Sequence, residues 1–319
     1  MLPDDVLLDI FDFYRMDPTF HPWMWVTLAH VCPRWRQVIF ASPRRLDLQF
    51  LCTPRTRVRE LLYFLPPAMP IMISNYFDSP TLHTTLSLED GSQVIAALEQ
   101  RDRVWWIHLH DLPSPLLEKL VTMMQETFPT LQYLRLWATD ETQAAPVLPD
   151  GFLGGSAPCL RTFWLRGIPF PGLSKLILST NDLVHFVLEK IPDSGYISPE
   201  TVTAALSTCT KLETLVIEIL SEDPHPDGPD PGSTGQVITS NTRVTLSALT
   251  YFSFDGNGGY FDDFVPRIES PLLARDSNPF WQHDTSVNRH VQYEASLTRT
   301  RFWSRYFSCP LIIPVPEDE

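Results

Sequence analysis

The sequence predicts an α/β fold, in which a short N-terminal helical module is followed by an irregular array of strand–turn–helix units. Two patterns predict it: the first 45 residues place apolar side chains at helical spacing, and a strand-length apolar motif then recurs as far as residue 254. Composition adds a third observation, because 30 proline and 13 glycine residues in a chain of 319 favour short, sharply ended elements. The low glycine content disfavours dinucleotide-binding folds. These folds need glycine in the loop whose backbone approaches the phosphates of the ligand.

Three short helices are expected within residues 1–45. Asp4 and Asp5 suit a first helical turn, because the helix dipole favours negative charge there. A second helix is expected over about residues 21–32, and Pro33 should start a third. Helices this small cannot bury six large aromatic rings, so the rest of the chain or a partner should cover some of them. The six are Phe11, Phe13, Trp23, Trp25, Trp35 and Phe40.

A six-residue pattern, apolar-x-x-apolar-x-apolar, recurs six times, with starts 27, 29, 23, 29 and 37 residues apart. This spacing is near that of leucine-rich repeats, in which a strand, a turn and a helix alternate. No copy carries the full asparagine-ladder consensus, so the array is expected to be degenerate. The copies are 104–109, 131–136, 160–165, 183–188, 212–217 and 249–254, with a weaker one ending at 86–88.

Helices are expected between several of these copies, at about 91–101, 114–128 and 198–209. Ser114 and Ser198 each precede a proline, so both are expected to be helix N-caps.

The remaining segments lack the repeat. Residues 46–80 are expected to link the helical module to a repeat region at 81–273, and residues 274–319 form a divergent C-terminal tail. Proline, glycine and acidic residues fill about 222–236, which is therefore expected to be a disordered surface loop.

Charge and cysteine content restrict the environment and the partners. A net charge of −14 argues against general nucleic-acid binding, because affinity for phosphate comes from lysine and arginine. Five scattered cysteines without C-x-x-C predict neither a disulfide framework nor a zinc site, and favour an intracellular location, cytoplasmic or nuclear. The most apolar stretch, 61–73, is interrupted by prolines and too short to span a bilayer, so no membrane role is expected.

Motifs for catalysis are missing from the sequence. There is no P-loop, G-x-S-x-G or H-E-x-x-H, so a non-catalytic chain without a cofactor is expected. The glycines at 256–259 fail the dinucleotide spacing and predict a turn. His108 and His110 share a strand face without a third ligand in reach, so no metal is expected. Residues 299–307 mix arginine with aromatic residues as single-strand nucleic-acid sites do, although the overall charge disfavours that role.

Two N-terminal clusters resemble the F-box. Leu-Pro-Asp-Asp-Val-Leu-Leu-Asp-Ile-Phe at 2–11 and Leu-Ala-His-Val-Cys-Pro-Arg-Trp-Arg at 28–36 match its anchor positions in order and spacing. Residues 169–183 and 191–200 are similar to the repeat region of fungal, basidiomycete-type F-box proteins, so the resemblance spans residues 2–273.

The resemblance implies the substrate receptor of a Skp-cullin-F-box ubiquitin ligase. An F-box at 1–45 would bind a small acidic Skp-type adaptor, and through it a cullin, while the repeats would present an unidentified protein substrate. The alternative is a protein-binding repeat module whose F-box no longer joins a ligase. The adaptor-facing or core positions carried over are Leu2, Pro3, Val6, Leu7, Ile10, Phe11, Leu28, Val31, Cys32 and Trp35.

Residues 32–59 hold seven arginines and one acid, a pattern that favours either an acidic partner or simply a solvated face. The arginines are Arg34, Arg36, Arg44, Arg45, Arg55, Arg57 and Arg59.

A substrate surface is predicted from strand alternation. Residues between the apolar positions of each copy should line the opposite face of the sheet, in columns that run from strand to strand. Tryptophan, tyrosine and arginine are enriched in binding hot spots, and they gather in the first three copies. The alternative is that other parts of the chain cover these side chains as core. The candidates are Trp106, His108, Tyr133, Arg135, Trp137, Trp164 and Arg166.

Overall fold

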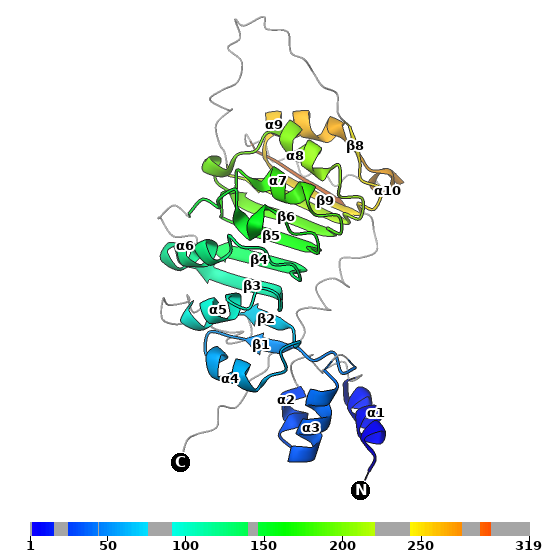
Figure 1. Ribbon diagram of the computed structural model, residues 1–319. Helices are drawn as coiled ribbons and strands as arrows, with labels where there is room; N and C mark the ends of the chain where they lie inside the picture. The colour runs from blue at the N-terminus through cyan, green and yellow to red at the C-terminus, as the bar shows by residue number, and fades with distance from the viewer. Residues whose placement is uncertain are drawn as a thin grey trace, which may run out of the picture.

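The computed structural model describes residues 2–15, 25–43, 45–75, 91–139, 146–220, 243–275 and 288–294. Over these residues the chain has an α/β fold built on a nine-stranded sheet, in the order β1-β2-β3-β4-β5-β6-β7-β9-β11 (Figure 1). Neighbouring strands from β1 to β9 are parallel, and β11 (Asn288–Glu294) runs antiparallel to β9. The strands therefore lie side by side in the order in which they occur along the chain.

Each copy of the apolar pattern forms a strand of this sheet. The strands are β3 (Val104–Leu112), β4 (Tyr133–Ala138), β5 (Thr162–Arg166), β6 (His185–Ile191), β7 (Thr214–Ile219) and β9 (Tyr251–Asn257). The pattern contributes three apolar side chains from each of six copies, and all eighteen are at most 5% exposed. The strand prediction is confirmed for every copy within the described residues; the weaker copy at 86–88 lies outside them.

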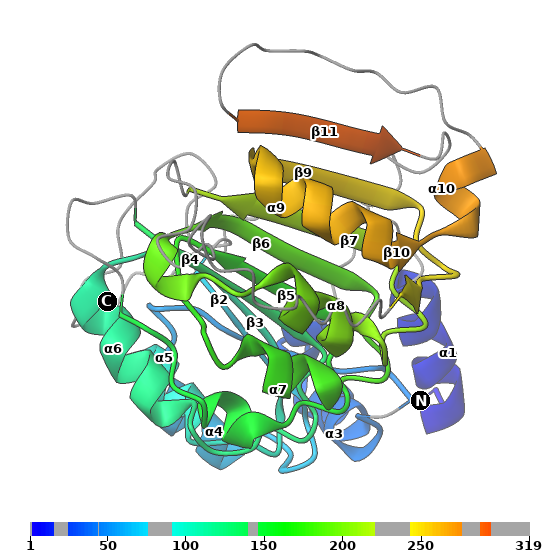
Figure 2. The same ribbon diagram turned by 90° about the horizontal axis from the view of Figure 1, so that it is seen from above.

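Helices cover one face of the sheet. Figure 2 shows α4 to α9 along the same side of the strands, where they enclose a single large apolar core with the strands. These helices are α4 (Val58–Phe64), α5 (Gly91–Leu98), α6 (Ser114–Met123), α7 (Leu173–Leu178), α8 (Pro199–Leu206) and α9 (Gly258–Phe264). The three helices expected between repeats are α5, α6 and α8, each ending three to five residues earlier than predicted.

Short elements complete the connections. β8 (Val244–Thr245) and β10 (Ile268–Glu269) form a small parallel pair, followed by α10 (Pro271–Arg275). The glycines predicted to form a turn instead lie where β9 passes directly into α9. There the Asn257 side chain accepts a hydrogen bond from Gly259 N at 2.7 Å and caps the helix.

The N-terminal module comprises α1 (Asp4–Arg15), α2 (Trp25–Ala29) and α3 (Pro33–Ala41), at the β1 end of the sheet (Figure 1). The predicted second helix is too long at its C-terminal end, and residues 21–24 lie outside the described part. Cys32 explains the early end, because it adopts an extended backbone, and its Sγ accepts a hydrogen bond from Trp35 N to cap α3.

Of the two serines predicted to be helix N-caps, one caps its helix and the other does not. Ser198 caps α8, and its Oγ accepts a hydrogen bond from Thr201 N at 3.3 Å. The prediction for Ser114 is wrong: the N-cap is Pro113, whose carbonyl accepts hydrogen bonds from Leu116 N and Leu117 N. The helix therefore begins one residue earlier, and Ser114 lies inside its first turn.

Residues 46–75, from the segment predicted to link the helical module to the repeats, contribute two strands to the sheet. They form β1 (Phe50–Cys52), α4 and β2 (Ile71–Ser74), and every residue of the two strands is buried. Strands of three and four residues are too short to carry the six-residue pattern, which explains why they were not predicted. The C-terminal segment likewise adds β11 to the sheet, whereas the loop predicted at 222–236 lies outside the described residues.

Candidate functional site

Two apolar stripes run along α1. Leu7 and Phe11 are buried, and the Phe11 ring meets the Trp35 ring of α3 edge-on at a centroid distance of 4.9 Å. Val6 and Ile10, one residue earlier at the same four-residue spacing, are 39% and 42% exposed. The stripe of Leu7 and Phe11 therefore packs inside the helical module, whereas the stripe of Val6 and Ile10 faces solvent and is accessible to a partner.

Further apolar side chains of the helical module are exposed as well, and together with Val6 and Ile10 they are called the helical surface here. Exposed apolar groups gathered on one small module are typical of an interaction site. The helical surface consists of Leu2, Val6, Ile10, Phe13, Tyr14, Val26 and Val31.

The ten predicted adaptor positions divide between core and surface. Leu7 and Phe11 are buried, so they are core positions of the module. Leu28, Cys32 and Trp35 are half-buried. The exposed positions are Leu2, Pro3, Val6, Ile10 and Val31.

The arginines of residues 32–59 are largely engaged within the chain. Of the six arginines that the structure describes in this region, four form ion pairs with the protein's own carboxylates, so the region is less basic than its sequence indicates. Such exposed pairs contribute only about 0–1 kcal/mol each and exchange partners readily. The pairs are Arg34–Asp4 at 2.9 Å, Arg45–Asp9 at 2.6 Å, Arg57–Glu60 at 3.8 Å and Arg59–Glu99 at 3.3 Å.

The strand register aligns the substrate candidates into columns, as alternation predicts. They lie on the face of the sheet opposite α4–α9, called the second face here. Trp106 pairs with Tyr133, and Tyr133 pairs with Thr162 on the next strand. A neighbouring column joins His108, Arg135 and Trp164, and a third joins Trp137 and Arg166.

Arginine and tryptophan side chains stack within these columns. The guanidinium carbon of Arg135 lies 3.5 Å from the ring centroid of Trp164, and that of Arg166 lies 4.0 Å from Trp137. Arg166 also forms an ion pair with Glu189 at 3.5 Å. The aromatic ring attracts the guanidinium cation, and the stacked geometry fixes the plane of the guanidinium hydrogen-bond donors.

Burial of the substrate candidates is uneven. Arg135 and Trp164 are only 8% and 7% exposed, and Trp106 and His108 are also buried. Tyr133, Trp137 and Arg166 are half-buried. The alternative interpretation, in which these side chains are buried and do not form a binding surface, therefore applies to four of the seven candidates.

An apolar cluster continues the first column toward β1. Trp106 stacks on Tyr133 with a centroid distance of 3.5 Å and an interplanar angle of 3°. Leu51 and Met72 join them, separate from the main core. Neither was a predicted site residue, because β1 and β2 were not predicted; their only sequence signal is alternation over three or four residues.

The other end of the second face is acidic. Glu189, Glu218 and Asp255 follow one another on β6, β7 and β9. Burial raises the pKa of Glu218, and the charges of Glu189 and Asp255 raise it further, against the opposing effect of Arg166 and Lys190. The second face therefore changes from aromatic and basic on β3–β5 to acidic on β6–β9.

Two histidines on this face are held neutral. Burial lowers the pKa of His108 well below its ordinary value, and the nearby charges of Arg135 and His110 lower it further. Burial, with the charge of Arg161, lowers the pKa of His185 to about 4. Across the described residues, no group of three histidine, cysteine or acidic side chains is placed to hold a metal ion.

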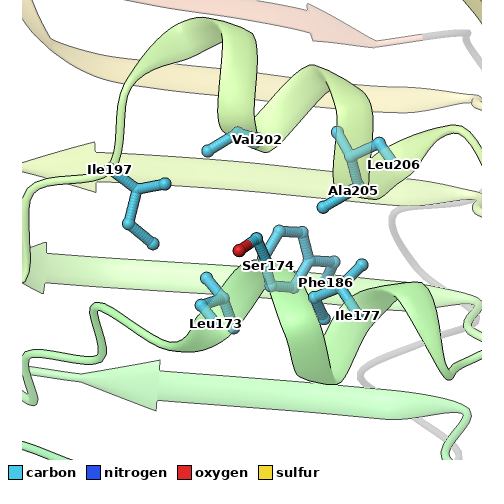
Figure 3. A pocket seen from close by; sticks show the side chains of 8 residues that line it. All are labelled: Leu173, Ser174, Ile177, Phe186, Ile197, Val202, Ala205 and Leu206. Atoms are coloured by element: carbon cyan, nitrogen blue, oxygen red, sulfur yellow. The ribbon is translucent and has the colours of Figure 1, made fainter. Parts of the chain in front are cut away.

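A small apolar pocket lies between α7, α8 and β6 (Figure 3). Its volume is about 10 Å³, which is room for roughly one water molecule, and Ser174 is the one polar residue among those lining it. This pocket is a packing gap inside the helical layer, too small for a substrate or cofactor. In the described ranges, no helix is long and apolar enough to cross a membrane.

No protein-family model, curated protein or solved structure matches the chain. The assignment of a function accordingly rests on the residues and their geometry.

Proposed function

We propose that the chain is the non-catalytic substrate receptor of a Skp-cullin-F-box ubiquitin ligase. Its N-terminal module would be an F-box that binds a Skp-type adaptor, and the sheet would be a degenerate leucine-rich-repeat array that binds a protein substrate. It would act in the cytoplasm or nucleus, where such ligases assemble.

The helical surface is the observation that carries this proposal. A module of three short helices buries Leu7, Phe11 and Trp25 but leaves a second set of apolar side chains in water. Covering apolar surface contributes roughly 25 cal/mol per Å², so docking of a partner on these side chains would be favourable. Because residues 2–41 resemble the F-box, we infer that this partner is a Skp-type adaptor.

The strand order supports the repeat half of the proposal. The nine strands of the main sheet lie side by side in chain order, with β8 and β10 set apart in a small separate pair, and helices cover one face. Stacked units of this kind are typical of repeat proteins, in which the residues between the apolar positions form a continuous binding surface. The stacked arginines and tryptophans on β4 and β5 are of the residue types enriched in binding hot spots.

Co-purification with a Skp-type adaptor tests the proposal. The full chain should elute with the adaptor as a 1:1 complex, and the double substitution Val6→Asp, Ile10→Asp should abolish it. Both positions are exposed, so aspartate there removes apolar contact without creating a buried charge. Substitution of Leu7 would not serve, because a charge at a buried position would unfold the module.

A matched control is available on α4. Tyr63 and Phe64 are exposed apolar residues outside the helical surface, at 86% and 71%, and Tyr63→Asp, Phe64→Asp should keep the complex. A folded wild-type chain that forms no complex would instead favour the alternative, a protein-binding repeat module with a vestigial F-box.

A further inference from the structure

A second exposed apolar patch lies on α4, outside the helical surface. Tyr63 and Phe64 are 86% and 71% exposed, and their rings meet edge-on at a centroid distance of 5.3 Å. Leu61 is 39% exposed, whereas Val58 and Leu65 are buried in the core. The helix is therefore amphipathic, and its outer face presents aromatic rings to solvent. Leu61, Tyr63 and Phe64 are called the α4 patch here.

Basic residues surround the α4 patch. Residues 55–64 contain three exposed arginines, Arg55, Arg57 and Arg59, and a single acid, Glu60. Two of these arginines form exposed ion pairs within the chain, and pairs of this kind exchange partners readily. This segment has a positive charge excess in a chain whose net charge is −14. The α4 patch therefore suits a partner that is both acidic and apolar.

The exposed stripe of Val6 and Ile10 on α1 has these properties. Asp5 and Asp9 are exposed and directly precede the two apolar residues, so they flank the stripe on the helix surface. Over its whole length α1 contains four aspartates and one arginine. The stripe and the α4 patch thus combine apolar side chains with opposite charges, which is the complementarity that specific contacts use.

The α1 and α4 helices of one chain do not meet. The Phe11 ring packs α1 against Trp35 of α3, and α1 lies apart from α4 in both views (Figures 1 and 2). A second copy of the chain, however, presents the same two surfaces. Because these surfaces differ, a contact between them is head-to-tail, and it leaves one stripe and one patch free at the two ends of the assembly.

We propose that the chain self-associates head to tail, with the Val6–Ile10 stripe of one copy docked on the α4 patch of the next. Self-association rests on these two surfaces and goes beyond the proposed function. Because the stripe is part of the helical surface, an adaptor bound there competes with the second copy and releases single chains. This competition is the one part of the inference that uses the proposed function.

Sedimentation equilibrium of the full chain tests the contact, at concentrations from about 1 to 100 µM. The mean mass of the wild type should rise from 36.5 kDa to beyond that of a dimer. The variants Val6→Asp, Ile10→Asp and Tyr63→Asp, Phe64→Asp should each stay at 36.5 kDa. An equimolar mixture of the two variants should form a dimer and stop there, because it retains one intact stripe and one intact patch per pair.

Charge variants test the electrostatic half of the contact. The substitutions Arg57→Glu, Arg59→Glu should lower the association constant about tenfold, because like charges then face one another. The matched control is Arg161→Glu, Arg243→Glu, which changes two exposed arginines outside α4 and should leave association unchanged. Equal weakening by both variants would contradict a contact matched by charge.

The wild-type masses decide by themselves if a variant does not fold. A wild type that stays monomeric over the whole range, or a mixture of folded variants that forms no dimer, would overturn the proposal. An adaptor that binds the chain without dissociating its oligomers would overturn the competition. A chain that binds no adaptor leaves the masses measured without it unaffected, so self-association and the proposed function fail separately.

Discussion

Trp164 and Trp137 occupy adjacent columns of the second face but should respond differently to truncation. Trp164 is 7% exposed and stacks on Arg135, whereas Trp137 is half-buried. We expect Trp164→Ala to lower the free energy of unfolding by about 3 kcal/mol, the range for core aromatic residues. Trp137→Ala should lower the free energy of unfolding by only about 1 kcal/mol. Urea denaturation measures both values, and equal costs would show that the two rings are equally buried.

His108 and His185 should make stability fall in acid. In the unfolded chain both titrate near pH 6.5, whereas the folded protein holds both pKa values lower, that of His185 at about 4. Between pH 6.5 and the folded pKa the unfolded chain binds more protons, so the free energy of unfolding decreases as pH decreases. The slope is at most about 1.4 kcal/mol per pH unit for each histidine.

Glutamine at both positions checks this dependence. In the variant His108→Gln, His185→Gln, the slope of stability against pH from 6.5 to 5 should be smaller than in the wild type, as followed by urea denaturation at each pH. An identical slope would mean that neither histidine is kept neutral by the fold.

At the scale of elements, the start of α8 depends on its cap and the start of α6 does not. Ser198→Ala removes the acceptor for Thr201 N and should destabilise the protein by about 1 kcal/mol. Ser114→Ala is the matched control, because Ser114 lies inside its helix without a capping bond, and it should change stability by less than about 0.5 kcal/mol. Thermal or urea unfolding compares them, and similar costs would contradict the assignment of the caps.

Elements that could be predicted from the sequence are those whose apolar pattern is long enough to be distinctive. Six residues with three buried side chains identified β3 to β7 and β9, and even their register. β1, β2 and α7 span three to six residues each, so no periodicity stands out above chance. These elements form because they pair with or pack against neighbouring strands of the sheet, and such tertiary contacts cannot be read from local sequence patterns.

For the candidate site, the sequence predicted which side chains share a face but not how exposed each one is. Alternation placed Arg135, Trp164 and their neighbours on one face, but it could not show how deeply each would be buried. Leu7 and Phe11 match the same motif as Val6 and Ile10, and only the packing of α1 against α3 separates core from surface. Motif matching identifies positions, whereas their exposure depends on the fold.

At the scale of the whole molecule, two surfaces of different character are separated. The helical surface is apolar and lies on the N-terminal module, at the β1 end of the sheet (Figure 1). The second face runs along the sheet and combines stacked arginines, aromatic rings and acids. In the proposed receptor the first surface would bind the adaptor and the second would bind the substrate, so binding at one leaves the other accessible.

Hydrogen–deuterium exchange of the full chain, with and without a Skp-type adaptor, tests this division most directly. The adaptor should slow exchange in residues 4–15 and 25–41 and leave exchange in β3 to β9 unchanged. Slower exchange confined to the strands, or no change in a folded chain at saturating adaptor, would contradict it.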